Sequence, residues 1–127
     1  MPQILLIEDD EQLSKMLIQM LKGDGHVVTL AGNGLEALAR LEQWRPDLIL
    51  TDILMAKMDG VETIMELAKR GIRIPIIAMS GGRRSISSEF TLNSAAMLGV
   101  SATLSKPFSR SQLRQAIDAA LARAAIS

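Results

Sequence analysis

Short apolar runs alternate with segments of helical period along the whole chain, and this alternation is the feature that most constrains the fold. Five runs predict strands: Gln3–Ile7, His26–Leu30, Asp47–Thr51, Ile74–Met79 and Ser101–Ser105. Most of these runs are continuous rather than alternating, which is typical of strands covered on both faces. Because right-handed helical crossovers join parallel strands, we expect an α/β fold, a (βα)5 doubly wound five-stranded parallel sheet.

The segments between the strands carry helical patterns and end signals. Apolar residues spaced for one helical stripe are Leu13, Met16, Leu17, Met20 and Leu21, and near the end of the chain Leu113, Ala116, Ile117, Ala120 and Leu121. Asn33 with Glu36, and Ser109 with Gln112, predict helix starts. Glycines that mark helix ends are Gly23, Gly25 and Gly71.

Composition narrows the class of protein. The 127 residues fit one domain, predicted over residues 1–127, and 14 basic against 14 acidic residues give no net charge. We therefore expect no nucleic acid bound through this domain and no membrane surface as partner. The absence of cysteine excludes disulfides and thiol chemistry, and no apolar run approaches the roughly 18 residues of a membrane span. A cytoplasmic protein is the expectation.

Charged and polar residues stand at the predicted ends of the strands. They are Glu8, Asp9 and Asp10 after the first strand, Asp52 after the third, Ser80 after the fourth and Lys106 after the fifth. In an open parallel α/β sheet, ligands bind outside the carboxyl ends of the strands, so these residues mark the candidate site.

Carboxylates crowded at one edge raise each other's pKa unless a cation lies among them. Oxygen ligands without cysteine favour Mg²⁺, which takes one or two carboxylates and keeps positions for phosphate oxygens. Lys106 could then neutralise a phosphoryl group and the Ser80 hydroxyl could donate to it. The sequence predicts a phosphoryl-transfer site in which one carboxylate is free to act as nucleophile.

The stretches "ILLIEDD", "DLILTDILMAKMDG", "IIAMSGG" and "LSKPF" together resemble the receiver domain of two-component response regulators, over essentially the whole chain. The resemblance implies a flavodoxin-like receiver fold. It also implies that Asp52 takes a phosphoryl group from a sensor histidine kinase or phosphotransfer protein. A phosphorylated domain would then alter its contacts with a downstream protein partner, and would catalyse only its own phosphorylation and dephosphorylation.

The same resemblance assigns roles to single residues. Asp9 and Asp52 would bind Mg²⁺ directly, the Leu54 main-chain carbonyl would be a third ligand, and Glu8 would act through water. Ser80 would be the switch hydroxyl and Lys106 the phosphoryl-contacting lysine, with a cis bond expected before Pro107. Asp10 is expected to favour the start of the first helix rather than to bind the ion.

The chain departs from the family pattern in three places. Ala56 stands where many members have proline, and the loop from Gly81 to Phe90 is lengthened. Thr103 occupies the position of the aromatic switch partner, so the lengthened loop is expected to move on phosphorylation in its place. We expect no role for His26.

Two other readings stay open. One is a magnesium-dependent phosphatase with an aspartyl nucleophile, although such enzymes have a second aspartate two residues on, where this chain has Leu54. The other is a receiver-like interaction domain that is never phosphorylated.

Overall fold

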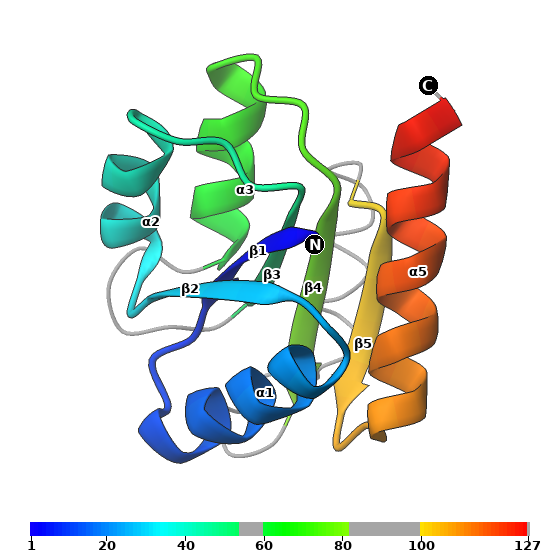
Figure 1. Cartoon of the computed structure of the whole chain (residues 1–127). Helices are drawn as coiled ribbons and strands as arrows, with labels where there is room; N and C mark the ends of the chain where they lie inside the picture. The colour runs from blue at the N-terminus through cyan, green and yellow to red at the C-terminus, as the bar shows by residue number, and fades with distance from the viewer. Residues whose placement is uncertain (54–59, 82–99, 127) are drawn as a thin grey trace.

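The computed structural model describes residues 1–53, 60–81 and 100–126. Five parallel strands form one sheet in the order β2-β1-β3-β4-β5 (Figure 1). The strands are β1 Gln3–Ile7, β2 Val27–Ala31, β3 Leu48–Asp52, β4 Ile76–Gly81 and β5 Ala102–Lys106. The helices are α1 Glu11–Gly23, α2 Gly34–Leu41, α3 Gly60–Lys69 and α5 Arg110–Ile126. The predicted doubly wound α/β fold is confirmed.

Alternate residues of the strands face opposite sides of the sheet, and each side has its own core. Ile4 and Leu6 of β1 pack with apolar residues of α1 and α5. Leu5 and Ile7 pack on the other side with residues of α2 and α3. Because both faces are covered, Ile4–Ile7 of β1 are all apolar and buried, as the continuous run predicted.

The strand predictions were correct in number and order, and four of the five differ from the structure by one or two residues at the ends. β2 begins at Val27 because the His26 N–H bonds the Leu21 carbonyl at the end of α1, whereas the Val27 N–H bonds Pro2 across the sheet. β3 and β5 extend to Asp52 and Lys106. Asp52 and Lys106 are therefore the last residues of their strands, and the sheet itself holds their main chain.

One position of the predicted α1 stripe was wrong. Met16 is 45% exposed, whereas Leu17 and Leu21 are fully buried and Ser14 is nearly so. Successive helical residues are about 100° apart, so Met16 lies at the margin of a buried face centred near Leu17 and Leu21. The Ser14 hydroxyl donates to the Glu11 carbonyl, which satisfies its hydrogen bonding inside the core.

The predicted helix ends are largely confirmed. Asp10 is the N-cap of α1, and its carboxylate accepts a hydrogen bond from the Leu13 N–H. Asn33 caps α2 in the same way, by accepting from the Glu36 N–H. Gly25 and Gly71 have φ angles of 91° and 71°, which side chains rarely adopt. The Lys106–Pro107 bond is cis, as expected.

Among the described residues, no helix combines the length and the apolar character that a membrane span requires.

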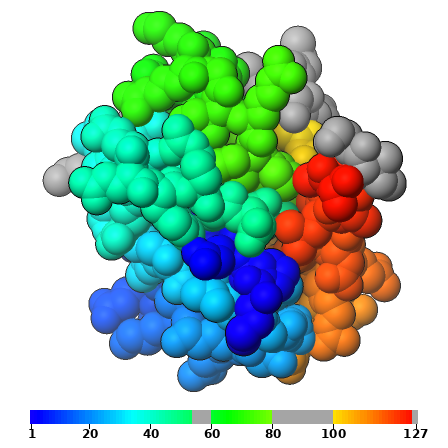
Figure 2. Space-filling view, turned by 45° about the horizontal axis from the view of Figure 1, so that its top comes forward, coloured from blue at the N-terminus to red at the C-terminus, as the bar shows by residue number. Residues whose placement is uncertain are grey.

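The start of the chain (dark blue) and the end of α5 (red) lie on the same face of the molecule (Figure 2). His26 is buried just before β2.

Candidate functional site

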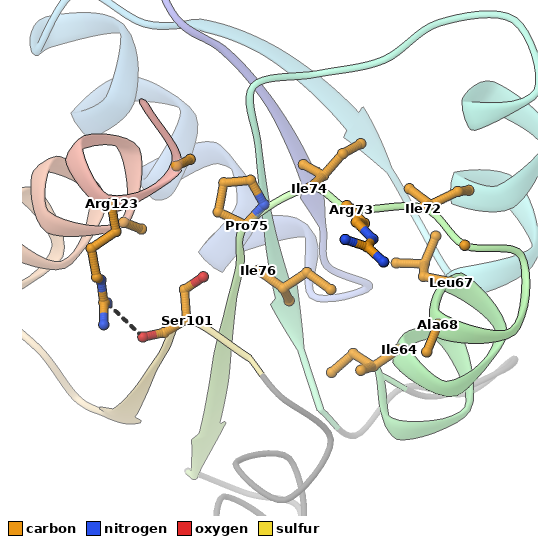
Figure 3. A pocket seen from close by; sticks show the side chains of 13 residues that line it. Ile64, Leu67, Ala68, Ile72, Arg73, Ile74, Pro75, Ile76, Ser101 and Arg123 are labelled. Atoms are coloured by element: carbon orange, nitrogen blue, oxygen red, sulfur yellow. Dashed lines mark hydrogen bonds between the residues drawn. The ribbon is translucent and has the colours of Figure 1, made fainter. Parts of the chain in front are cut away.

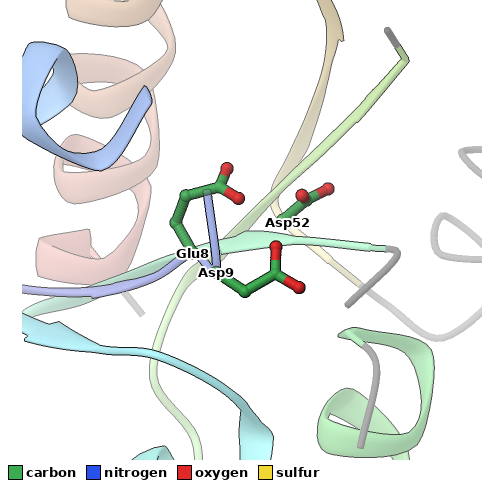
Figure 4. A group of neighbouring side chains, drawn as sticks. All are labelled: Glu8, Asp9 and Asp52. Carbon is green, nitrogen blue, oxygen red and sulfur yellow. The ribbon is translucent and has the colours of Figure 1, made fainter. Parts of the chain in front are cut away.

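Three acidic side chains meet at the carboxyl ends of β1 and β3. The two strands are neighbours, with Ile7 opposite Thr51, so the residues that follow Ile7 lie beside Asp52. One carboxylate oxygen from each of Glu8, Asp9 and Asp52 lies within 4.8 Å of the others. Figure 4 shows the three side chains projecting into one shared space. Glu8 and Asp52 are only 3% and 5% exposed, and Asp9 is half-buried.

Lys106 brings a positive charge to this group from β5. Its ammonium nitrogen lies 3.1 Å from Glu8 Oε1 and 3.2 Å from Asp52 Oδ2, and its side chain is 15% exposed. The contact with Asp52 was predicted, whereas the contact with Glu8 was not. No sequence signal would have revealed it, because it depends on how far the Lys106 side chain reaches from β5 past β4 and β3 toward the end of β1.

The cluster carries more negative than positive charge. Burial and the neighbouring Asp52 charge raise the pKa of Glu8 to about 7, against the opposing effect of Lys106 and of the Asp10 N–H. Such a group gains from an added cation, which would offset the repulsion that burial makes costly.

The donors fit a hard divalent ion. All three are carboxylates, and in the residues the structure describes they form the one group of acids and histidines gathered closely enough to hold a metal. Mg²⁺ prefers such oxygen ligands and tolerates a site with only one or two direct carboxylates. Both Glu8 oxygens already accept hydrogen bonds, one from Lys106 and one from the Asp10 N–H.

The structure describes the other predicted site residues only in part. The backbone of Ser80 lies in β4 opposite Ser105, and its side chain is outside the described part of the structure. Thr103 is exposed in β5 and pairs with Ala78. Leu54, Ala56 and residues 82–90 of the lengthened loop lie outside the described residues.

A pocket of about 630 Å³ lies at the other end of the sheet (Figure 3). It is lined by the segment from the end of α3 to the start of β4 and by the last turns of α5. Arg123 donates a hydrogen bond of 2.7 Å to the Ser101 carbonyl at its border. Parallel strands begin at this edge and end at the carboxylates, so the pocket is not part of the acidic site.

Sequence comparisons show a family match. The chain matches the model of the response regulator receiver domain over residues 4–118. It is 36% identical to the transcriptional regulatory protein ZraR of Klebsiella oxytoca, over 98% of this chain and 27% of that protein. It is also 36% identical to the transcriptional regulatory protein PdtaR of Mycobacterium tuberculosis, over 96% of this chain and 58% of that protein. The chain thus spans between about a quarter and about three fifths of these relatives.

Solved structures agree with the sequence comparisons. The signal receiver domain of a signal transduction histidine kinase from Syntrophus aciditrophicus superposes with a TM-score of 0.85 at 27% identity, over 96% of this chain and 91% of that one. The crystal structure of FixJ-N gives a TM-score of 0.86 at 26% identity, over 95% and 94% of the two chains. Phosphorylation and Mg²⁺ binding are generic in this family. The chain therefore belongs to the receiver domains of two-component response regulators.

Proposed function

We propose that Asp52 is the phosphoacceptor of this receiver domain and that Mg²⁺ is held by Asp9 and Asp52. The observation that supports this most is the position of the buried Asp52 carboxylate, which contacts the Lys106 ammonium at 3.2 Å and has an oxygen within 4.8 Å of carboxylate oxygens of Glu8 and Asp9. The Leu54 main-chain carbonyl and the Ser80 hydroxyl complete the proposed site on the strength of the sequence pattern alone.

In the proposed reaction, a carboxylate oxygen of Asp52 attacks the phosphorus of a phosphohistidine on a sensor histidine kinase or phosphotransfer protein. The new O–P bond forms as the N–P bond breaks, and the leaving imidazole keeps the electron pair and takes up a proton. Bound Mg²⁺ would supply positive charge to the phosphoryl oxygens. Lys106 already contacts Asp52 and would neutralise part of the charge that the arriving phosphoryl group brings.

Glu8 fits an indirect role at the ion. Its two oxygens are occupied by Lys106 and by the Asp10 N–H, which leaves it the less available of the buried carboxylates for direct coordination. We therefore propose that Glu8 acts at the ion through water, as the resemblance implies, and that it also holds Lys106 in place through their hydrogen bond.

The chain would act as a switch that alters its contacts with a downstream protein, and would catalyse only its own phosphorylation and dephosphorylation. The relatives are named transcriptional regulatory proteins, and this chain matches only part of their length. The cytoplasmic location and the lack of nucleic-acid binding through this domain stay predictions.

The test incubates the protein with Mg²⁺ and acetyl phosphate and measures intact mass. We expect the mass of one phosphoryl group to be added, and none in an Asp52→Asn variant or in excess chelator. Turnover of external phosphomonoesters would instead indicate the phosphatase. No phosphorylation and no turnover would indicate an interaction domain that works without phosphate.

A further inference from the structure

Gly60, the first residue of α3, lies directly against the main chain of the proposed phosphoacceptor. A Cβ atom built on Gly60 would lie 2.2 Å from the Asp52 carbonyl oxygen and 2.7 Å from Ile53 Cα. These neighbours are main-chain atoms, so they cannot move aside as a flexible side chain would. Gly60 is buried, and positive φ angles are recorded only for Gly25 and Gly71 among the glycines described, so space rather than backbone torsion requires the glycine.

The peptide group that follows Asp52 is held by two hydrogen bonds, and the next peptide group by a third. The Thr51 hydroxyl donates to the Asp52 carbonyl at 2.9 Å, and the Ile53 N–H donates to the Met79 carbonyl at 2.9 Å. The Gly60 N–H donates to the next carbonyl, that of Ile53, at 2.7 Å. The start of α3 is thereby joined to the end of β3 by a hydrogen bond and a close main-chain contact.

We propose that Gly60 is a positioning residue for Asp52. By letting α3 abut this peptide, it sets the direction in which the Asp52 carboxylate leaves the main chain, toward Lys106 and the acidic pair. Any side chain at position 60 would displace the Asp52 carbonyl or the helix by about 1 Å, and a misplacement of that size can cost roughly 100-fold in rate. This inference rests on the proposed function of Asp52.

The test compares Gly60→Ala with the unmodified protein and with a matched glycine. Gly32→Ala is the control, because a Cβ there would meet only the end of the Glu36 side chain, at 3.4 Å. Mg²⁺ affinity is measured by calorimetry. The rate of phosphorylation by acetyl phosphate is measured at saturating Mg²⁺ from the intact mass, and stability is measured by urea denaturation without metal. For Gly60→Ala we expect Mg²⁺ affinity about tenfold weaker and phosphorylation about 100-fold slower in protein that is still folded. Gly32→Ala should stay within about twofold of the unmodified protein in both measurements.

A second substitution separates positioning from bulk. Gly60→Ser should lose as much Mg²⁺ affinity and phosphorylation rate as Gly60→Ala, because the clash arises at the Cβ atom that both variants add. A folded Gly60→Ala protein with unchanged Mg²⁺ affinity and phosphorylation rate, or one altered only in its urea midpoint, would overturn the proposal.

If Gly60→Ala does not fold, Thr51→Val decides the matter, since it removes the hydroxyl that holds the same Asp52 carbonyl. We expect Thr51→Val to weaken Mg²⁺ binding several-fold, and unchanged binding would overturn the positioning role. If the unmodified protein binds Mg²⁺ but accepts no phosphoryl group, the proposed function fails while calorimetry still tests Gly60. An unmodified protein that binds no Mg²⁺ would overturn both.

Discussion

The ammonium nitrogen of Lys106 lies 3.1 Å from the carboxylate of Glu8, a residue 98 positions earlier in the chain. The same nitrogen contacts Asp52 at 3.2 Å, so one lysine is shared by two buried acids. Before any metal or phosphoryl group arrives, Lys106 is the cation that offsets their repulsion. Lys106 must also contact the phosphoryl group when it arrives. It therefore has two successive roles, first toward the acids and then toward the phosphoryl group.

These two roles predict opposite effects for a Lys106→Met variant. Removing the cation makes the acidic group more negative, so Mg²⁺ should bind roughly tenfold more tightly. Phosphorylation by acetyl phosphate at saturating Mg²⁺ should nevertheless fall by about 100-fold, because no lysine neutralises the phosphoryl oxygens. Calorimetry and intact mass measure the two quantities. Weaker Mg²⁺ binding in the variant would contradict this account of Lys106.

Glu8→Gln should stabilise the metal-free protein. The pKa of Glu8 is raised to about 7, mainly by burial and by Asp52, so its ionised form is disfavoured in the folded state. A raised carboxyl pKa means that folding favours the protonated form, and the penalty is largest above pH 7 and fades toward pH 4.5. At pH 8 the neutral glutamine should raise the free energy of unfolding by on the order of 2 kcal/mol, measured by urea denaturation.

The gain for Glu8→Gln should shrink at pH 5 and in saturating Mg²⁺, where the added cation offsets the charge in the unmodified protein. A gain that is equal at pH 5 and pH 8 would show that repulsion is not its source.

The acidic site could be predicted from the sequence because chain order and a parallel sheet are sufficient to place the carboxyl ends of the strands at one edge. Glu8, Asp9 and Asp52 follow from that rule, and the Lys106–Asp52 contact agrees with the expectation from the lysine–proline pair. The direct ion ligands and the roles of Ser80 and Thr103 stay predictions.

What the sequence could not show depends on distances between main chains. The glycine of "MDG" indicates a turn or a helix start, but the sequence does not indicate that Gly60 lies against the Asp52 carbonyl. The exposure of Met16 was missed for a related reason, since the helical pattern gives a stripe without its exact centre. Helix caps were easier, because they depend on residues three positions apart.

The start of α5 offers a test of such a cap. Ser109 Oγ accepts from the Gln112 N–H at 3.0 Å, and Gln112 Oε1 accepts from the Ser109 N–H at 2.8 Å. Ser109→Ala should lower the free energy of unfolding by about 1 kcal/mol, whereas Ser109→Asp should keep most of the stabilisation that the cap provides. Urea denaturation measures both variants. Equal losses in the alanine and aspartate variants would show that the hydrogen bond to the Gln112 N–H is not what matters.

Asp24 joins the end of α1 to the start of α5, and this contact should appear in the acid unfolding of the protein. Asp24 Oδ1 accepts hydrogen bonds from Arg110 at 2.7 Å and from Arg114 at 2.8 Å. Hydrogen bonds from Arg114 and then Arg110 lower the pKa of Asp24 to about 2 from its usual 3.8. A carboxyl group whose pKa is lower in the folded than in the unfolded protein stabilises the fold at pH values above its unfolded pKa. This stabilisation is lost as the pH falls through its folded pKa.

We therefore expect Asp24→Asn to be less stable than the unmodified protein by a constant amount above about pH 5. The difference should close between about pH 4 and pH 2, where Asp24 becomes protonated in the unmodified protein. Urea denaturation at a series of pH values measures this difference, and Asp118→Asn, in the helix α5 that carries Arg110 and Arg114, is the control. Because Arg110 and Arg114 remain in the variant, a difference that persists unchanged to pH 2 would mean that the ionised carboxylate is not the source of the stability.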